Sequence, residues 1–171
     1  MIISIGNGVT QQVNGELNDL AGGQIYLYAN RDNSEEIIEF TNEDFEAIEE
    51  KVPHVKGVTP QYSLYGNAVG KKGSFDAYIY AGTESMEFIN NNPIKHGRYF
   101  SESDYYAANK VCVISEGDAV KMFGTTDVIG MDIETSMYGI SQDMTIVGIR
   151  EDKASAMFIN YGDSVSIEIP I

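Results

Sequence analysis

Two segments with a two-residue period, and a glycine-bounded turn between them, constrain the fold more than any other feature of this sequence. Residues 62–68 and 74–80 alternate well enough to be strands, and Gly70-Lys71-Lys72-Gly73 lies between them. Alternation of this kind is typical of strands that bury one face, and a short glycine-containing connection joins two such strands as antiparallel neighbours. The sequence therefore predicts antiparallel strands within a mixed α+β fold.

A capping box with a hydrophobic staple predicts a helix ahead of those strands. Thr41 is placed to cap the first turn, and Asp44 follows three residues later to reach back to the cap. Phe40 and Phe45 flank the cap at the positions where two apolar side chains pack on each other. The predicted helix ends before Pro53, because the residue before a proline is disfavoured in a helix.

Apolar periodicity and glycine or proline punctuation predict the remaining elements. A second capping box, Ser101 with Asp104, opens one of the further helices. Further helices are predicted over residues 9–20, 85–90, 102–108 and 116–123, and further strands over residues 24–29, 55–59, 111–115, 131–135, 144–149 and 164–171. Residues 136–143 are predicted as a turn region. The elements between Gly82 and Asp152 are expected to form a small mixed α/β unit.

The charge of the chain is strongly one-sided. With 171 residues and 43% apolar side chains, the chain can bury a core without disulfides. Its 26 acidic and 11 basic residues give a net charge of -15. This charge repels phosphate backbones and anionic lipid headgroups, so we expect no nucleic-acid partner, while cationic partners remain open. No run reaches the roughly 20 apolar residues of a membrane helix, so the fragment is expected to be soluble.

Residues of the types that catalyse reactions or bind metals are few and scattered. His54 and His96 have no second histidine or cysteine at ligand spacing, and Cys112 lies in a predicted buried strand where its thiol would be inert. Gly6-Asn7-Gly8 precedes a helix but lacks the third glycine and the lysine of nucleotide-binding loops. We therefore predict no catalytic residues, no metal site and no cofactor, and expect that the chain is not an enzyme.

Tyrosines alternate along two of the predicted strands. Tyr26 and Tyr28 lie on one of them, and Tyr78 and Tyr80 lie on the other. Such a face can be a ligand platform or half-buried sheet surface. It keeps open a second class of function, a free-standing secreted module that binds a peptide or a glycan. A third class, an acid–base hydrolase, requires two carboxylates close together in a cleft with separated pKa values.

Both ends of the sequence have the character of cut ends. The chain starts with the apolar segment Met1-Ile2-Ile3-Ser4-Ile5, with no loop before it, and it stops at Ile171 inside the last predicted strand. We therefore expect native sequence to continue on both sides.

Several short phrases resemble, in their order and spacing, the extracytoplasmic core domain of MacB-type ABC transporter permeases. Each phrase alone is weak, whereas the series is specific and covers nearly the whole chain. The phrases are ISIGNGVTQQV (3–13), LAGGQIYLY (20–28), TNEDFEAI (41–48), VPHV (52–55), VTP (58–60), GRYFSESD (97–104), VCVI (111–114), MFG (122–124), VIG (128–130) and TIVGI (145–149).

The resemblance implies two lobes that stand outside the cytoplasmic membrane. A porter-like α+β subdomain would comprise residues 1–81 and 153–171, with residues 1–5 at the membrane-proximal end of the first membrane helix. A small inserted α/β subdomain of the Sabre-like kind would comprise residues 82–152. The resemblance also implies a non-catalytic domain that couples ATP-driven motion to export of a peptide, drug or lipid-linked substrate.

The resemblance further implies partners. These are an ABC ATPase subunit or domain acting through the membrane part, a membrane-fusion-type adaptor protein, and a second permease in a homodimer, whereas the isolated fragment is expected to be monomeric. The sequence does not assign the contact residues. The acidity and the richness in Asn and Tyr depart from the family pattern and favour a Gram-positive source, with export of an antimicrobial peptide. The net charge of -15 would suit a cationic peptide or a basic adaptor face.

Overall fold

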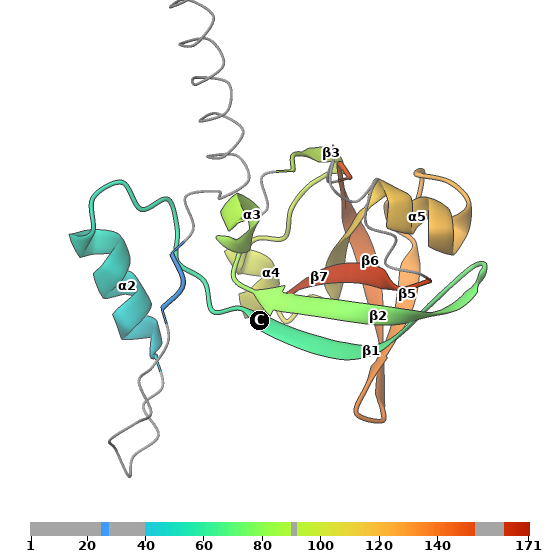
Figure 1. The fold of residues 1–171 in the computed structure, drawn as a ribbon, viewed down its shortest axis with the longest axis horizontal. Helices are drawn as coiled ribbons and strands as arrows, with labels where there is room; N and C mark the ends of the chain where they lie inside the picture. Colours follow the sequence, from blue (N-terminus) through green and yellow to red (C-terminus); the bar gives the residue numbers. More distant parts are fainter. Residues whose placement is uncertain (1–24, 28–39, 90–91, 153–162) are drawn as a thin grey trace, which may run out of the picture.

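A computed structural model gives the structure of residues 25–27, 40–89, 92–152 and 163–171 (Figure 1). The helices are α2 (Asn42–Lys51), α3 (Met86–Ile89), α4 (Glu102–Tyr106) and α5 (Glu116–Phe123). The strands are β1 (Tyr62–Gly70), β2 (Gly73–Gly82), β3 (Ile94–Gly97), β4 (Val111–Ser115), β5 (Asp132–Met137), β6 (Ile140–Arg150) and β7 (Val165–Pro170). Within these ranges, none of the helices has the length and apolar character needed to span a bilayer.

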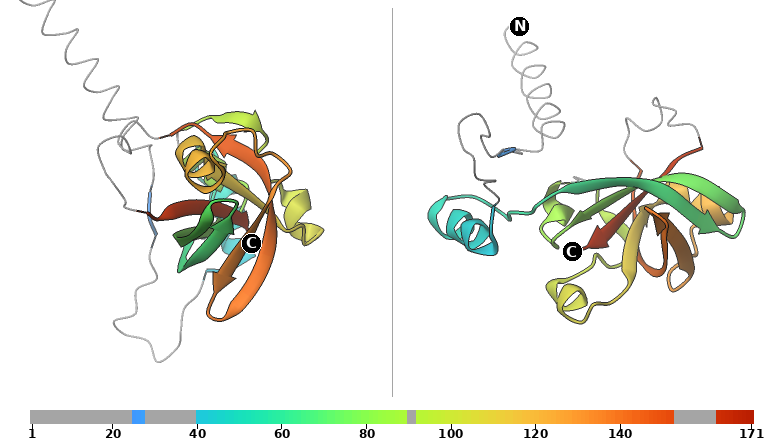
Figure 2. Two further views of the ribbon diagram at one scale, coloured as in Figure 1. Left: turned by 90° about the vertical axis from the view of Figure 1, so that its right-hand side faces the viewer. Right: turned by 90° about the horizontal axis from the view of Figure 1, so that it is seen from below.

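Six of the strands close into a barrel of mixed strand direction. The strand order is β3-β6-β4-β7-β2-β1-β5, and β5 also pairs with β6, which closes the sheet. β7 runs parallel to β2 and β4 runs parallel to β6, whereas the other pairs are antiparallel. β3 is an additional short strand on β6. The views in Figures 1 and 2 show the barrel from three sides.

Apolar side chains fill the barrel, and α5 closes one end of it. Buried residues of this cluster include Ala68, Ala77, Ile79, Cys112, Ile133, Ile146, Ile149 and Ile167. Ala119 and Met122 of α5 belong to the same cluster. β1 ends at Gly70, where a Cβ atom would lie 2.9 Å from the Cβ of Met122. Glycine at this position therefore allows α5 to approach the end of the strand closely.

Local signals located most of the elements correctly. β1 and β2 form the predicted hairpin, in register from their open ends to Gly70 opposite Gly73. Both predicted capping boxes are present, at the starts of α2 and α4. The staple is formed as well, because the rings of Phe40 and Phe45 have centroids 6.4 Å apart. α5 ends at Gly124, whose φ of 83° is the left-handed conformation that favours glycine.

Two local predictions were wrong. Residues 55–59 form no strand, and the hydroxyl of Thr59 instead accepts a hydrogen bond from the backbone of Thr83 at 2.9 Å. The predicted turn region 136–143 is mostly strand, because β5 and β6 continue to a two-residue reversal at Tyr138-Gly139 with φ values of 49° and 80°. The predicted helix 9–20 lies outside the described residues, and of the predicted strand 24–29 only residues 25–27 are described, without strand structure.

The predicted α+β fold class is confirmed as a mixed α/β domain, but the barrel crosses the predicted subdomain limits. β1 and β2, from residues 62–82, pair with β5 and β7, so that strands from both predicted subdomains share one sheet. Neither residue 82 nor residue 152 therefore separates two sheets. By contrast, α2 buries no residue and lies to one side of the barrel (Figure 1). The division into two subdomains stays a prediction.

Candidate functional site

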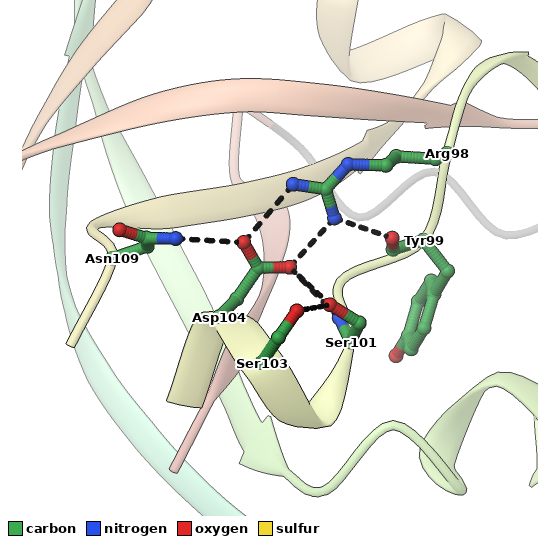
Figure 3. A network of polar contacts seen from close by, with 6 residues as sticks. All are labelled: Arg98, Tyr99, Ser101, Ser103, Asp104 and Asn109. Carbon is green, nitrogen blue, oxygen red and sulfur yellow. Dashed lines mark hydrogen bonds and ion pairs between the residues drawn. The ribbon is translucent and has the colours of Figure 1, made fainter. Parts of the chain in front are cut away.

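A bidentate ion pair fixes the segment that leads from β3 into α4 (Figure 3). The Nη1 and Nη2 atoms of Arg98 donate to the two carboxylate oxygens of Asp104 at 2.6 and 3.0 Å. The backbone N–H and the hydroxyl of Ser101 donate to the same carboxylate, each at 2.9 Å, and the side-chain amide of Asn109 donates at 3.0 Å. Asp104 is only 2% exposed.

This set of donors holds Asp104 in its charged form. The guanidinium of Arg98 is the main cause that places the pKa of the Asp104 carboxyl far below its usual range. A general acid or base needs a pKa near the working pH and a free oxygen aimed at a substrate. Asp104 has neither, so its role is to anchor α4 and the loop before it.

A second polar cluster is buried between the barrel and the same loop. Arg150 of β6 donates from Nε and Nη2 to the carboxylate of Glu168 on β7 at 3.1–3.2 Å, and from Nη1 to the carbonyl of Asn92 at 2.6 Å. The hydroxyl of Tyr99 donates to Glu168 at 2.7 Å, and the guanidinium lies 4.8 Å from the centre of the Tyr99 ring. Burial is the main cause that raises the pKa of Tyr99.

A third polar contact joins the start of α5 to β7. The backbone N–H of Asp118 donates to the hydroxyl of the cap residue Ser115 at 3.1 Å. The carboxylate of Asp118 accepts from the backbone N–H of Ser166 at 3.1 Å. The N–H of Gly117 donates to Asp152 at 3.0 Å, next to this cap. Burial raises the pKa of Asp118. These contacts tie the helix to the barrel wall.

The other candidate residues are placed as follows. Cys112 is fully buried in the barrel, as predicted, and burial raises the pKa of its thiol. His54 and His96 are both exposed. In the sequence, His54 comes before β1 and His96 comes after β2. Among the residues with described structure, no three His, Cys, Asp or Glu side chains are grouped so as to hold a metal ion. Gly6-Asn7-Gly8 lies outside these residues.

A shallow hollow of about 300 Å³ lies where α4, β6 and the end of β7 meet. It is lined by Asp104, Tyr105, Ala108, Asn109, Lys110, Gln142, Met144, Ile169, Pro170 and Ile171. Its carboxylate, Asp104, is the one already saturated by Arg98, Ser101 and Asn109. The hollow is thus lined by both polar and apolar side chains, and the side-chain carboxylate among them is already engaged within the protein.

The outer face of the barrel carries a row of tyrosines, which we call the tyrosine ladder (Tyr78, Tyr65 and Tyr138). Tyr78 and Tyr65 are direct partners across β2 and β1, and their rings meet edge to face with centroids 5.4 Å apart. The two residues are 42% and 57% exposed, and Tyr138 is 87% exposed. The sequence indicated Tyr78, but Tyr80, its predicted partner, packs against the buried cluster around Tyr99 and Phe100.

The fold resembles that of the solved external regions of two bacterial proteins. The periplasmic region of MacB from Actinobacillus actinomycetemcomitans superposes with a TM-score of 0.59 over 78% of this chain and 56% of that chain, at 21% identity. The extracellular domain of the noncanonic ABC-type transporter YknZ from Gram-positive bacteria gives a TM-score of 0.58 over 77% of this chain and 62% of that chain, at 20% identity.

The family follows from the sequence as a whole. The model of the MacB-like periplasmic core domain matches residues 1–170, and the chain belongs to this family. It is 28% identical over 158 residues to the pyoverdine export ATP-binding/permease protein PvdT of Pseudomonas aeruginosa, and 24% identical over 135 residues to the macrolide export ATP-binding/permease protein MacB of Pasteurella multocida. These matches cover 91% and 77% of this chain, but only 23% and 21% of the relatives.

Proposed function

We propose that this chain is the external, non-catalytic domain of an ABC-type export permease, and that it couples ATP-driven motion of the membrane part to export. The observation that carries the proposal is the match of the family model to residues 1–170. The printed functions of the relatives, pyoverdine export and macrolide export, support an export role. The chain spans about a quarter of the length of those relatives, so an ATPase part would lie elsewhere in the intact transporter.

The proposed place of the domain is the extracytoplasmic side of the cell membrane. There it would work with an ABC ATPase subunit or domain, a membrane-fusion-type adaptor and a second permease, while the isolated fragment would be monomeric. Its substrate would be a peptide, a drug or a lipid-linked product. The barrel supports a mechanical role, because two of its polar clusters tie the Tyr99 loop and α5 to β6 and β7.

We also propose a different limit between the two subdomains. The first lobe would end near Pro60, and the barrel from Tyr62 to Pro170 would form the second lobe. α2 buries no residue, which supports a helix that completes its packing against another part of the protein. The joint contains the backbone N–H of Val58, which donates to Glu49 at 2.8 Å, and the carbonyl of Val58, which accepts from the hydroxyl of Thr83 at 3.3 Å.

Complementation with the intact permease tests the export role. A strain lacking the gene receives either the intact permease or a version in which residues 62–170 are replaced by a Gly/Ser linker. We expect equal membrane levels and equal basal ATP hydrolysis, but loss of resistance to exported toxic compounds with the shortened permease. Full resistance with the shortened version would contradict the proposal. If the chain were instead a secreted binding module, the protein made from the native gene would be found in the culture medium and not in the membrane fraction.

A further inference from the structure

The tyrosine ladder consists of a pair on two neighbouring strands and a third tyrosine in the turn that follows β5. Tyr78 of β2 is the register partner of Tyr65 of β1. β1 pairs with β5 from Val69 opposite Glu134 to Asn67 opposite Ser136, and Tyr138 follows two residues after Ser136, just beyond the end of β5. Tyr138 therefore extends the row at the β5–β6 turn. All three side chains are exposed, so the row is a surface feature and not part of the core.

Carboxylates surround the ladder on the same outer face. Burial alternates along these strands, and Asp76, Asp132, Glu134 and Asp143 fall on the outward positions. Glu134 and Asp143 are direct register partners across β5 and β6. β1, β2, β5 and residues 140–145 of β6 contain no Lys or Arg. Within the described ranges none of the four carboxylates forms an ion pair.

This arrangement of carboxylates and tyrosines makes the surface less stable when nothing is bound to it, and it favours binding of a cationic ligand. Like charges directly opposite each other on a sheet repel, and a contiguous exposed aromatic row is typical of an interaction site. Lys and Arg side chains attract carboxylates and also bind over tyrosine rings through cation–π contacts. A ligand that carries both positive charge and apolar surface matches both features at once.

The free edge of β1 defines the shape of that ligand. β1 pairs with β2 along its whole length, but with β5 only at Asn67, Ala68 and Val69. Within the described residues, the segment Tyr62–Tyr65 therefore has a strand partner on one edge only. An unpaired strand edge accepts an extended segment through backbone hydrogen bonds, and alternate side chains then contact the face beside it.

We propose that the tyrosine ladder and the surrounding carboxylates bind an extended cationic peptide. This inference names the chemistry of a partner and the face that binds it. The interpretation of the bound peptide as an export cargo rests on the proposed function. The binding itself does not require the rest of the transporter, so the proposal can be tested with the 171-residue chain.

Fluorescence anisotropy with a labelled peptide of four Lys-Trp repeats tests the proposal. We expect saturable binding that weakens at high salt, and no binding of the matched peptide of four Glu-Trp repeats. Two double variants remove the two features separately: Tyr65→Ser with Tyr138→Asn for the ladder, and Glu134→Gln with Asp143→Asn for the charges. Each is expected to weaken binding by about tenfold, since central anchors dominate such interfaces.

Matched control variants separate this face from general charge and aromaticity. Glu46→Gln with Glu50→Gln removes two exposed carboxylates one helical turn apart on α2, with the same change in net charge. Tyr105→Ser with Tyr106→Ser removes another exposed edge-to-face tyrosine pair, on α4. Both controls are expected to keep binding within about twofold of the original chain, because neither pair lies on this face.

The outcomes that overturn the proposal are distinct. If the Glu134/Asp143 and Glu46/Glu50 variants weaken binding equally, the attraction is due to net charge and the face is not a site. If the peptide does not bind but a folded basic protein such as cytochrome c does, the surface docks a protein and not a peptide. Thermal melting verifies that each variant is folded. Failure here leaves the export role intact, since that role is tested by complementation, and failure of complementation leaves this binding result unchanged.

Discussion

Arg150 and Glu168 form an ion pair across an intervening strand of the barrel. Arg150 is at the end of β6 and Glu168 is on β7, while β4 lies between these two strands in the sheet. The guanidinium Nη2 lies 3.1 Å from Oε2 of the carboxylate, and the residues are 5% and 8% exposed. The pair therefore connects β6 to β7 across β4, and the hydroxyl of Tyr99 joins the neighbouring loop to it.

Glu168→Gln should destabilise the fold, because it removes the carboxylate charge that pairs with the buried guanidinium of Arg150. We expect a loss of about 3 kcal/mol in the free energy of unfolding, measured by urea titration. The double variant Arg150→Met with Glu168→Leu should recover most of this loss, since it removes both charges together. A single variant as stable as the original chain would show that water reaches this cluster.

Asp104→Asn should destabilise α4 and change the acid stability of the domain. The pKa of Asp104 is lowered in the folded state, so its stabilising contribution is complete above the unfolded pKa of about 3.9 and is lost as the pH falls through that value towards the lower folded pKa. Urea titrations at neutral pH and at acid pH measure both effects. At neutral pH we expect a loss of about 2 kcal/mol, and below the folded pKa the difference from the original chain should shrink. A difference that does not depend on pH would contradict this account.

Gly97→Ala should cost more stability than Gly130→Ala, although both residues have positive φ, at 73° and 83°. A Cβ atom at Gly97 would collide with the carbonyl oxygen of Val147, whereas nothing lies within 4 Å of one at Gly130. We expect about 1 kcal/mol for the backbone strain alone at Gly130 and about 3 kcal/mol or more at Gly97. Denaturation midpoints of the two variants measure the difference, and equal losses would show that β3 moves freely away from β6.

Cys112 should be unreactive in the folded chain, because its side chain is fully buried and burial raises the pKa of the thiol. A thiol reagent should label it only after addition of denaturant. Ser74→Cys provides a matched control, since residue 74 is exposed on β2 and should react at once in the native chain. Rapid labelling of Cys112 without denaturant would indicate frequent opening of the barrel at β4.

The elements found from sequence are those with a local cause. Helix ends are marked by residues close to them in the sequence: Thr41 and Ser101 cap two helix starts, and Gly124 follows the end of α5. Periodicity and caps were therefore sufficient to predict these helices. The β5–β6 reversal was missed because Tyr138-Gly139 lacks the usual Asn-Gly or Asp-Gly signal of a two-residue turn. Barrel closure was missed because it depends on pairing between segments far apart in the sequence, such as β1 with β5.

The same distinction applies to the tyrosine ladder. The pair Tyr65 and Tyr78 could have been found from sequence, because the two residues are symmetric about the turn between Gly70 and Gly73. Tyr138 could not, since its place near this pair follows from the long-range pairing of β5 with β1. In the Arg98–Asp104 pair, Asp104 was recognised from the sequence as a member of a capping box. The bidentate contact with Arg98 could not be predicted, because it depends on the fold of the loop before α4.

The position of β7 determines when this domain can complete its folding. β7 is the last of the strands in the described residues, yet it lies in the middle of the sheet, between β2 and β4. During synthesis, the earlier strands must wait until residues 165–170 emerge before the ring can close. A nascent chain arrested before Val165 would expose an open seam between β2 and β4, with the edges of both strands available to aggregate.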